Sequence, residues 1–392
     1  MKISAIYVSF MLGLTVLGQN NFGANQSQPD INSLPRCSSV YTRRDIKTFS
    51  DGEMSNLSRL LGIMRDNGWF TWFARVHTEN FNTIHGRSMF MPFHRIFIHD
   101  FERIMRTYDS NFALPYYNSP QDFSNPSGSS LFSSRMFGGN GSGPNRCLAD
   151  GIQGGWMINY PSNQCLNRAF NAGNSIQPWY NPPYIESLVQ RSRSFDEFRS
   201  ELEYSQHGSV HTGIGGTMEA MESPNDFFFF LHHSYIDLVW WRFQTANPAN
   251  MMSYNGGSSI NDRIINYNIP VSDVMQLGYG PMCYQYDSSQ LRKSGKLIDN
   301  KVEAGLRNLN PTIVSKYFPL FAQSESTVSK NMLSNSSGTS TNGTILKMAY
   351  PNEPDPMWIK MHGYNMETAI KVRNNAISMI DDLHAAGFSN PY

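Results

Sequence analysis

Two triplets of histidines stand out among the ten in this chain. Each triplet gathers enough rings to hold one transition-metal ion, because neutral imidazole is a common protein ligand for such metals. A lone buried histidine is more often structural, so the argument depends on how these residues are framed and spaced. The six candidate metal ligands are His77, His85 and His94 in the first triplet and His207, His211 and His233 in the second.

The spacing of the histidines predicts which helices and loops hold each triplet. His207 and His211 are four positions apart, which on a helix places both rings on one face. Adjacent helical residues point about 100° apart, so only one of His232 and His233 can face the same metal. In the first triplet, seven and then eight residues separate successive histidines, an interval too irregular for one uninterrupted helix. We therefore expect its first two members near helix ends or on a loop, and the third at the start of another helix.

The donor set favours copper. All six candidates offer nitrogen and no carboxylate joins them, which suits copper better than magnesium, calcium or manganese. The Glu-x-x-His arrangement of di-iron bundles and the His-Glu-x-x-His signature of zinc proteases do not accompany these histidines. Zinc remains a weaker alternative.

The residues around the triplets resemble both signatures of the tyrosinase family, the type-3 copper proteins that include catechol oxidases and molluscan haemocyanins. The first signature is matched by His85, the FMPFHR run at 90–95, Ile98 and Glu102. The second is matched by the DFFFFLHH run at 226–233 and by Asp237. The resemblance extends from about residue 69 to residue 244.

The resemblance implies two copper ions, each held by three histidines, which bind dioxygen between them while a phenol or catechol docks against the pair. It assigns His233, and not His232, to the metal. It also implies that Phe229 packs on a ligand ring near the entrance, with core packing as the alternative reading. Asp237 is then a charged partner for a ligand or for Arg95, with an ordinary surface salt bridge as the alternative.

Two further positions bear on which phenols react. Many relatives that hydroxylate monophenols carry asparagine directly after the first histidine of the second triplet, where it helps a glutamate orient a water that deprotonates the phenol. This chain has Gly208 there, and the matching glutamate is Glu203. An exposed helix charge is the alternative reading of Glu203. We therefore predict catechol oxidation ahead of monophenol hydroxylation.

The predicted fold is mainly α: a four-helix bundle core that holds a dinuclear copper site, with long loops and a small carboxyl-terminal extension. Periodic apolar positions predict helices at 54–73, 94–108, 195–208 and 226–244. We expect a copper-binding domain over residues 19–244 and an extension over residues 245–392 packed on the core. In that extension, strand-like segments are expected near 278–286 and 312–321 and an amphipathic helix near 367–386.

Residues 1–18 join Lys2 to an apolar run typical of a signal peptide, so a secreted, extracellular protein without a membrane anchor is expected. The four cysteines admit three pairings, of which we expect Cys147 with Cys165 and Cys37 with Cys283. Glycosylation sequons that fit this setting occur at Asn25, Asn56, Asn140, Asn335 and Asn342.

Charge excludes one class of partner. The 31 basic and 31 acidic residues balance without a basic stripe, so no nucleic-acid partner is expected. The expected partners are dioxygen and small phenols or catechols, and tyrosyl or dopa residues of matrix proteins stay open as substrates. The expected function is a secreted copper-dependent phenol oxidase. A haemocyanin-like oxygen carrier and a catalytically weak matrix protein are the alternatives.

Overall fold

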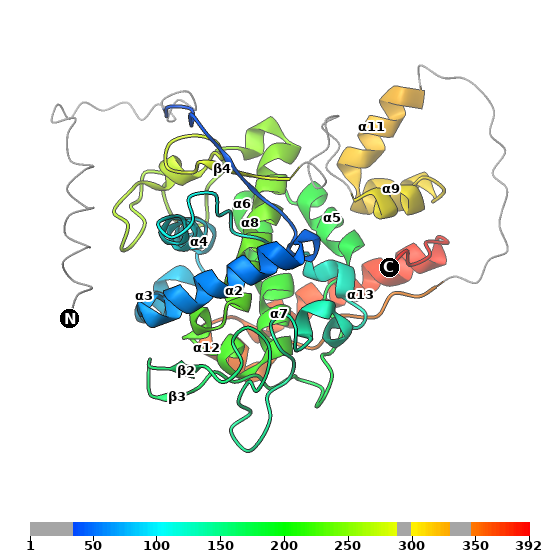
Figure 1. The fold of residues 1–392 in the computed structure, drawn as a ribbon. Helices are drawn as coiled ribbons and strands as arrows, with labels where there is room; N and C mark the ends of the chain where they lie inside the picture. Colours follow the sequence, from blue (N-terminus) through cyan, green and yellow to red (C-terminus); the bar gives the residue numbers. More distant parts are fainter. Residues whose placement is uncertain (1–33, 288–298, 330–345) are drawn as a thin grey trace. The chain divides into compact units, whose positions relative to one another are not determined.

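The computed structural model describes residues 34–287, 299–329 and 346–392. The expected signal peptide at 1–18 lies outside these ranges, as do the sequons at Asn25, Asn335 and Asn342. The described chain is mainly helical, as predicted (Figure 1). Among the described residues, no helix has the length and apolar character needed to span a membrane.

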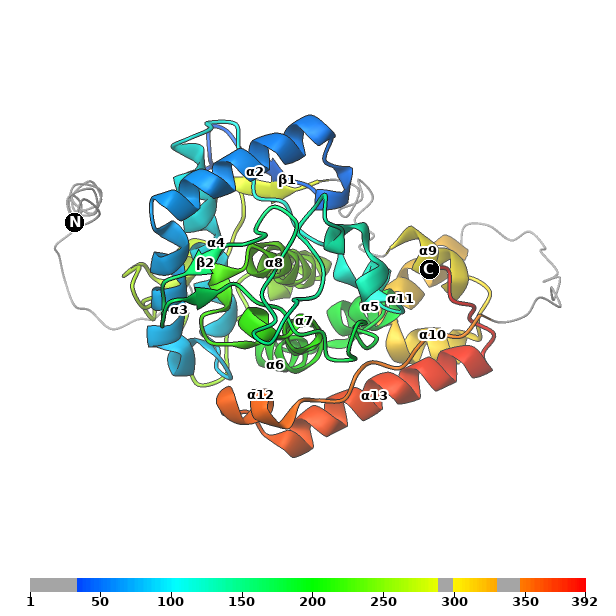
Figure 2. The same ribbon diagram turned by 60° about the horizontal axis from the view of Figure 1, so that its bottom comes forward.

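The predicted bundle is formed by helices that surround α8 (Phe228–Ala246). Figure 2 views α8 nearly end-on, with α3 (Trp69–Ile84) and α4 (Phe90–Arg106) to its left. Below it lie α6 (Phe195–Leu202) and α7 (Gly208–Ile214), which are joined by a π-helical turn, η7 (Glu203–His207). Because α8 lies at the centre of the core, all of its residues from its start to Trp240 are buried.

Two predicted elements differ from the structure. The expected helix at 54–73 is divided into α2 (Asp51–Asp66) and α3, because Gly68 adopts a left-handed conformation with φ of 76° that ends one helix before the next begins. The prediction of a strand-like segment at 312–321 is wrong. It forms α10 (Pro311–Tyr317) and the start of α11 (Pro319–Ser329), and the Asn310 side chain caps α10 by accepting from the Thr312 amide.

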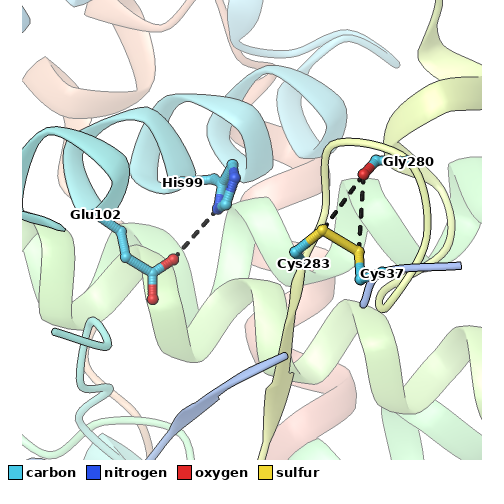
Figure 3. The surroundings of a disulfide bond; sticks show 5 residues. All are labelled: Cys37, His99, Glu102, Gly280 and Cys283. Carbon is cyan, nitrogen blue, oxygen red and sulfur yellow. Dashed lines mark hydrogen bonds and ion pairs between the residues drawn. A yellow bond between two sulfur atoms is a disulfide. The ribbon is translucent and has the colours of Figure 1, made fainter. Parts of the chain in front are cut away.

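Short strands and two disulfides fix distant segments. Strand β1 (Tyr41–Arg43) pairs in parallel with β4 (Tyr284–Tyr286), and β2 (Met157–Ile158) pairs antiparallel with β3 (Gln164–Cys165). Both predicted disulfides are present, Cys37 with Cys283 beside the first sheet and Cys147 with Cys165 in the long loop region. In Figure 3, both sulfurs of the first disulfide face the Gly280 carbonyl oxygen, at 3.7 and 3.4 Å.

The remaining elements flank this core. The other α-helices are α5 (Pro182–Arg191), α9 (Asn300–Leu306), α12 (Pro356–Met361) and α13 (Met366–Ala385), and α13 confirms the helix expected near 367–386. Figure 2 shows α12 and α13 running along the side of the core that carries α6 and α7. Short 3₁₀ turns complete the described elements: Ile46–Thr48, Ser119–Asp122, Pro126–Gly128, Ser130–Phe132, Gly216–Glu219, Ser223–Asn225, Pro248–Asn250 and Val271–Val274.

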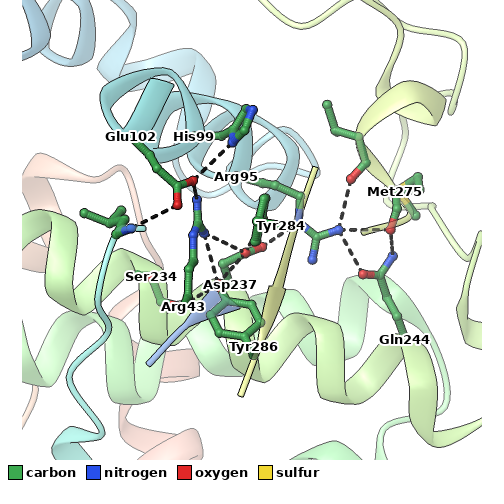
Figure 4. A network of polar contacts seen from close by, with 12 residues as sticks. Arg43, Arg95, His99, Glu102, Ser234, Asp237, Gln244, Met275, Tyr284 and Tyr286 are labelled. Carbon is green, nitrogen blue, oxygen red and sulfur yellow. Dashed lines mark hydrogen bonds and ion pairs between the residues drawn. The ribbon is translucent and has the colours of Figure 1, made fainter. Parts of the chain in front are cut away.

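A buried polar network joins α4, α8 and the β1–β4 sheet (Figure 4). Asp237 of α8 accepts from Arg95 of α4 at 2.5 Å and from the Tyr286 hydroxyl of β4 at 2.6 Å, and it lies 3.5 Å from Arg43 of β1. Arg43 in turn pairs with Glu102 of α4 at 2.7 Å. The Arg95 and Asp237 side chains are 0% and 3% exposed, so the surface salt bridge considered for Asp237 is excluded.

Removing the Asp237 carboxylate should destabilise the fold strongly. In Asp237→Ala, Arg95 and Arg43 would lose a buried counter-charge, and the free energy of unfolding should fall by about 3–5 kcal/mol. The matched control is Asp66→Ala, which removes the exposed partner of Arg65 and should change it by less than about 1 kcal/mol. Urea unfolding of both copper-loaded variants measures the difference. Equal midpoints for the two would show that the network does not support the core.

Candidate dinuclear metal centre

The first triplet converges as predicted, although one of its members is carried differently from expectation. His77 lies in the middle of α3, not near an end, and His85 is the residue that directly follows α3. His94 lies in α4, which begins at Phe90, one turn earlier than expected. One ring nitrogen from each of the three lies within 4.8 Å of the others.

The second triplet also converges within 4.8 Å. His207 ends the π-helical turn, His211 lies in α7 and His233 lies in α8. His232 is outside the triplet, and its Nε2 lies 3.3 Å from the His207 carbonyl oxygen instead. The geometry therefore agrees with His233 as the inward-facing member of the adjacent pair.

Backbone carbonyls fix the tautomer of five of these rings. In each, Nδ1 faces a carbonyl oxygen, so it carries the proton and leaves the Nε2 lone pair for a metal. The acceptors are Met221 for His77 at 2.6 Å, Phe81 for His85 at 3.1 Å, Phe90 for His94 at 2.8 Å, Glu203 for His207 at 3.4 Å, and Met218 for His211. The Nε2 atoms of His77, His94 and His207 are buried without a hydrogen-bond partner. Orphaned nitrogens of this kind fit a metal ion.

Burial keeps the rings uncharged. All six are at most 3% exposed. Desolvation lowers the pKa of His77 to about 3 and that of His211 to about 4, and it lowers the pKa of the other four well below the usual value. The rings are therefore neutral at pH 7, as metal ligation requires.

The two triplets face each other closely enough to form one centre. The His94 ring of the first triplet stacks on the His233 ring of the second, with centroids 4.3 Å apart. His85 of the first triplet faces His207 of the second with centroids 5.8 Å apart. This arrangement suits a pair of metal ions that share a small ligand.

Phe229 packs on a ligand ring and is also part of the buried core, as in the alternative reading, so it does not lie at an entrance. Its ring stacks on His233 with centroids 4.1 Å apart and also faces His77 at 5.2 Å. Phe229 is fully buried, so it restrains ligand rings from both triplets from the interior of the protein.

Glu203 lies beside the centre and is fully buried, so its reading as an exposed helix charge is wrong. Its carboxylate accepts from the Gly86 amide at 2.7 Å, from Arg199 at 2.8 Å and from the Tyr364 hydroxyl. Burial raises the pKa of Glu203, and the Arg199 charge opposes that rise. Because Gly86 directly follows His85, the carboxylate connects the second triplet's helix to the chain beside a first-triplet ligand.

Sequence reasoning missed two residues at the centre, both on the carboxyl-terminal side of the chain. Trp358 stacks on His211 with centroids 5.1 Å apart, and His362 lies 4.9 Å from His85 by the same measure. A Cβ atom on Gly208 would lie 3.1 Å from the Trp358 indole nitrogen, so this glycine leaves room for the indole. The available signal was the four-residue spacing of Trp358 and His362, which matches that of His207 and His211.

Comparison with known proteins identifies the class. The family described as the common central domain of tyrosinase matches residues 67–246. A tyrosinase of Streptomyces antibioticus is 33% identical over 194 residues, which cover 45% of this chain and 70% of that protein. Tyrosinase ustQ of Aspergillus flavus is 29% identical over 292 residues, 65% of this chain and 81% of that protein. The chain belongs to the tyrosinase family.

The fold comparison agrees. A polyphenol oxidase from Thermothelomyces thermophila superposes with a TM-score of 0.56 at 20% identity, covering 64% of this chain and 91% of that one. The family cofactor is a pair of copper ions, and the two histidine triplets supply a matching donor set. The chain is therefore an oxidoreductase of the copper-dependent tyrosinase and polyphenol oxidase type.

The adjacent histidines allow a matched test of the ligand assignment. His233→Ala should lose bound copper, because it removes a ring that faces the metal, whereas His232→Ala should retain two copper ions per chain. Metal analysis after dialysis against a weak chelator measures both, with circular dichroism to confirm folding. Copper lost from the His232 variant and kept by the His233 variant would reverse the assignment.

Proposed function

We propose that this protein is a secreted phenol oxidase that oxidises catechols to o-quinones with dioxygen. The observation that carries the proposal is the pair of facing all-imidazole triplets in a chain of the tyrosinase family. The Nε2 atoms of His77, His94 and His207 are buried without another partner. His77, His85, His94, His207, His211 and His233 are the proposed copper ligands. When bound, the copper pair supplies dioxygen binding and the two-electron oxidation of the substrate.

The protein's own residues orient the ligand rings and exclude water from the site. The carbonyl acceptors hold five Nδ1–H groups, so that each Nε2 keeps its direction without rearrangement during turnover. Phe229 holds the His233 ring by stacking. Buried aromatic side chains around the ligands exclude water, which strengthens electrostatic interactions within the site.

Glu203 is the proposed proton acceptor for the substrate, through a water molecule. Its carboxylate already accepts from Gly86, Arg199 and Tyr364, and Gly208 offers no side-chain amide to hold the water with it. A catechol needs only to lose two electrons and two protons. A monophenol needs deprotonation before oxygen insertion, so the weaker water site limits it more. This favours diphenol over monophenol oxidation.

Two disulfides in the described residues support secretion, since such bonds persist in oxidising compartments. The sequence signal at 1–18 points the same way. Small phenols or catechols are the proposed substrates, and tyrosyl or dopa residues of matrix proteins are a second class that the same chemistry would accept.

Reversible oxygen binding is a second candidate function, favoured by one observation. Trp358 and His362 lie against ligand rings of both triplets and shield the centre, as an oxygen carrier would require. A carrier would bind dioxygen and release it unchanged, whereas an oxidase would consume it when a catechol is present.

Oxygen uptake decides between these functions. Copper-loaded protein offered a catechol should consume dioxygen, and His211→Ala should not. A monophenol should react about a hundredfold more slowly than the catechol, the lower end of the usual contribution of a positioned base. The measurement is repeated with Trp358→Ala, so that a covered site is not mistaken for an inactive one. Reversible oxygen binding without uptake in both the intact protein and this variant would establish the carrier.

A further inference from the structure

One loop carries the carbonyl groups that orient a ligand ring in each triplet. We call residues 215–227, which connect α7 to α8, the ligand loop. His77 Nδ1 lies 2.6 Å from the Met221 carbonyl oxygen, and His211 Nδ1 donates to the Met218 carbonyl oxygen. The other three rings of fixed tautomer bond to carbonyls four residues earlier. The directions of the His77 and His211 rings therefore depend on how the ligand loop is held.

The ligand loop is held by the long insert between the two triplets. Its own regular structure consists of the short 3₁₀ turns Gly216–Glu219 and Ser223–Asn225. Functional side chains are oriented precisely only when their supports are themselves fixed by further hydrogen bonds. Those bonds come from residues 147–171, which we call the stapled insert because the disulfide between Cys147 and Cys165 closes it.

At the start of the ligand loop, Asn167 of the stapled insert forms a reciprocal pair with Thr217. The Thr217 amide donates to the Asn167 carbonyl oxygen at 3.0 Å, and the Thr217 hydroxyl accepts from the Asn167 amide at 3.2 Å. Thr217 is 3% exposed. Because Met218 directly follows Thr217, this pair fixes the chain beside the carbonyl that orients His211.

At the end of the ligand loop, the side chain of Gln153 bridges two backbone groups. Its Nε2 donates to the Asn225 carbonyl oxygen at 3.2 Å, and its Oε1 accepts from the Phe227 amide at 2.8 Å. Asn225 in turn donates from Nδ2 to the carbonyl oxygens of Tyr160, in the stapled insert, and Glu222, at 3.2 and 3.1 Å. Because Glu222 directly follows Met221, these bonds fix the chain beside the carbonyl that orients His77.

The stapled insert joins these two supports into one unit. The Gly155 amide donates to the Leu148 carbonyl oxygen at 2.8 Å, and the Leu166 amide donates to the Trp156 carbonyl oxygen at 2.9 Å. These bonds and the disulfide connect the turn that carries Gln153 to the segment that carries Asn167. Gln153 is fully buried, so its two bonds to the ligand loop are shielded from water.

We propose that Gln153 is a positioning residue of the dinuclear centre: it orients His77 through the end of the ligand loop, while the pair of Asn167 and Thr217 orients His211 through its start. The inference rests on the proposed function, since it takes both rings as copper ligands. One ring belongs to each triplet, so the stapled insert sets the two metal positions relative to each other.

A role confined to stability predicts a different result. A side chain that only satisfies two buried backbone groups contributes to the stability of the whole fold, and its loss would loosen all the ligand rings alike. Positioning through the loop predicts instead that each end of the ligand loop affects one ring. Loss of the Gln153 amide should release His77, and loss of the Thr217 hydroxyl should release His211.

The test uses the full-length, copper-loaded protein in its cuprous, diamagnetic form without dioxygen and with both disulfides intact. NMR measures how fast each Nδ1 proton of the five rings exchanges with solvent. Gln153→Met keeps an unbranched side chain without the amide, and Thr217→Val removes the hydroxyl. The control, Asn181→Ala, removes a buried side chain that caps α5 by accepting from the Tyr184 amide at 2.9 Å.

We expect the His77 proton to exchange about tenfold faster in Gln153→Met, and the His211 proton about tenfold faster in Thr217→Val, as the loss of one supporting hydrogen bond would give. The other rings, and all five rings in the control, should keep their rates. Copper should also pass to a chelator about tenfold faster from both loop variants than from the control, because supports of metal ligands contribute to metal affinity.

The outcomes separate this inference from the proposed oxidase. Equal acceleration in all five rings of Gln153→Met, or no acceleration in any, would overturn the positioning role. If Gln153→Met does not fold, Thr217→Val still tests the support of the ligand loop, and an unchanged His211 proton would contradict it. The expected pattern in a protein that oxidises no catechol would support the positioning role and contradict the oxidase. A chain that holds no copper would overturn both.

Discussion

The hydrogen bonds from histidine Nδ1 to backbone carbonyls determine the geometry of the metal centre. Three of the six proposed ligands bond to a carbonyl four residues earlier, so the helix that carries each ring also orients it. His77 and His211 instead use Met221 and Met218, which lie on one loop. That loop therefore couples a ligand of the first triplet to a ligand of the second. Because the tautomer of these five rings is fixed before metal arrives, the packing of the helices and of this loop decides where their nitrogens converge.

The loop can approach both triplets only because of its backbone. Gly215 and Gly216 have positive φ values of 65° and 59°. A Cβ atom on Gly215 would lie 2.1 Å from the Ala169 carbonyl oxygen, which no side chain could tolerate. The Arg95 and Asp237 pair sets the relation between α4 and α8. Arg95 follows His94, and Asp237 is one turn after His233, so a buried ion pair accompanies the stacked rings of these two ligands.

Local signals in the sequence were sufficient for the ligand sets and for most of the helices that carry them. The framed histidines were predicted from their spacing and from the family signatures, and the helix near 367–386 from short-range periodicity. Cys147 and Cys165 are 18 positions apart, and pairing them leaves Cys37 for Cys283. The segment at 312–321 was mistaken for a strand because β-branched Thr312, Ile313 and Val314 outweighed the helix start signal of Asn310 and Pro311. The expectation that His77 lies near a helix end or on a loop was wrong for a different reason, since the break at Gly68 starts a new helix without altering the apolar pattern.

The segment that carries Trp358 and His362 could not be predicted, because its contacts with the centre join residues that are more than a hundred positions apart. Neither Trp358 nor His362 belongs to a signature, and their role depends on where the chain returns after α11. Gly208 is an example of a position that the structure interprets differently from the sequence. In the sequence, this glycine stands where many monophenol-hydroxylating relatives have an asparagine, so no side-chain amide lies beside Glu203. In the structure, it is also the space into which Trp358 fits. An asparagine there would supply the amide, but its side chain would crowd the Trp358 indole, so the two readings of this position are linked by one backbone site.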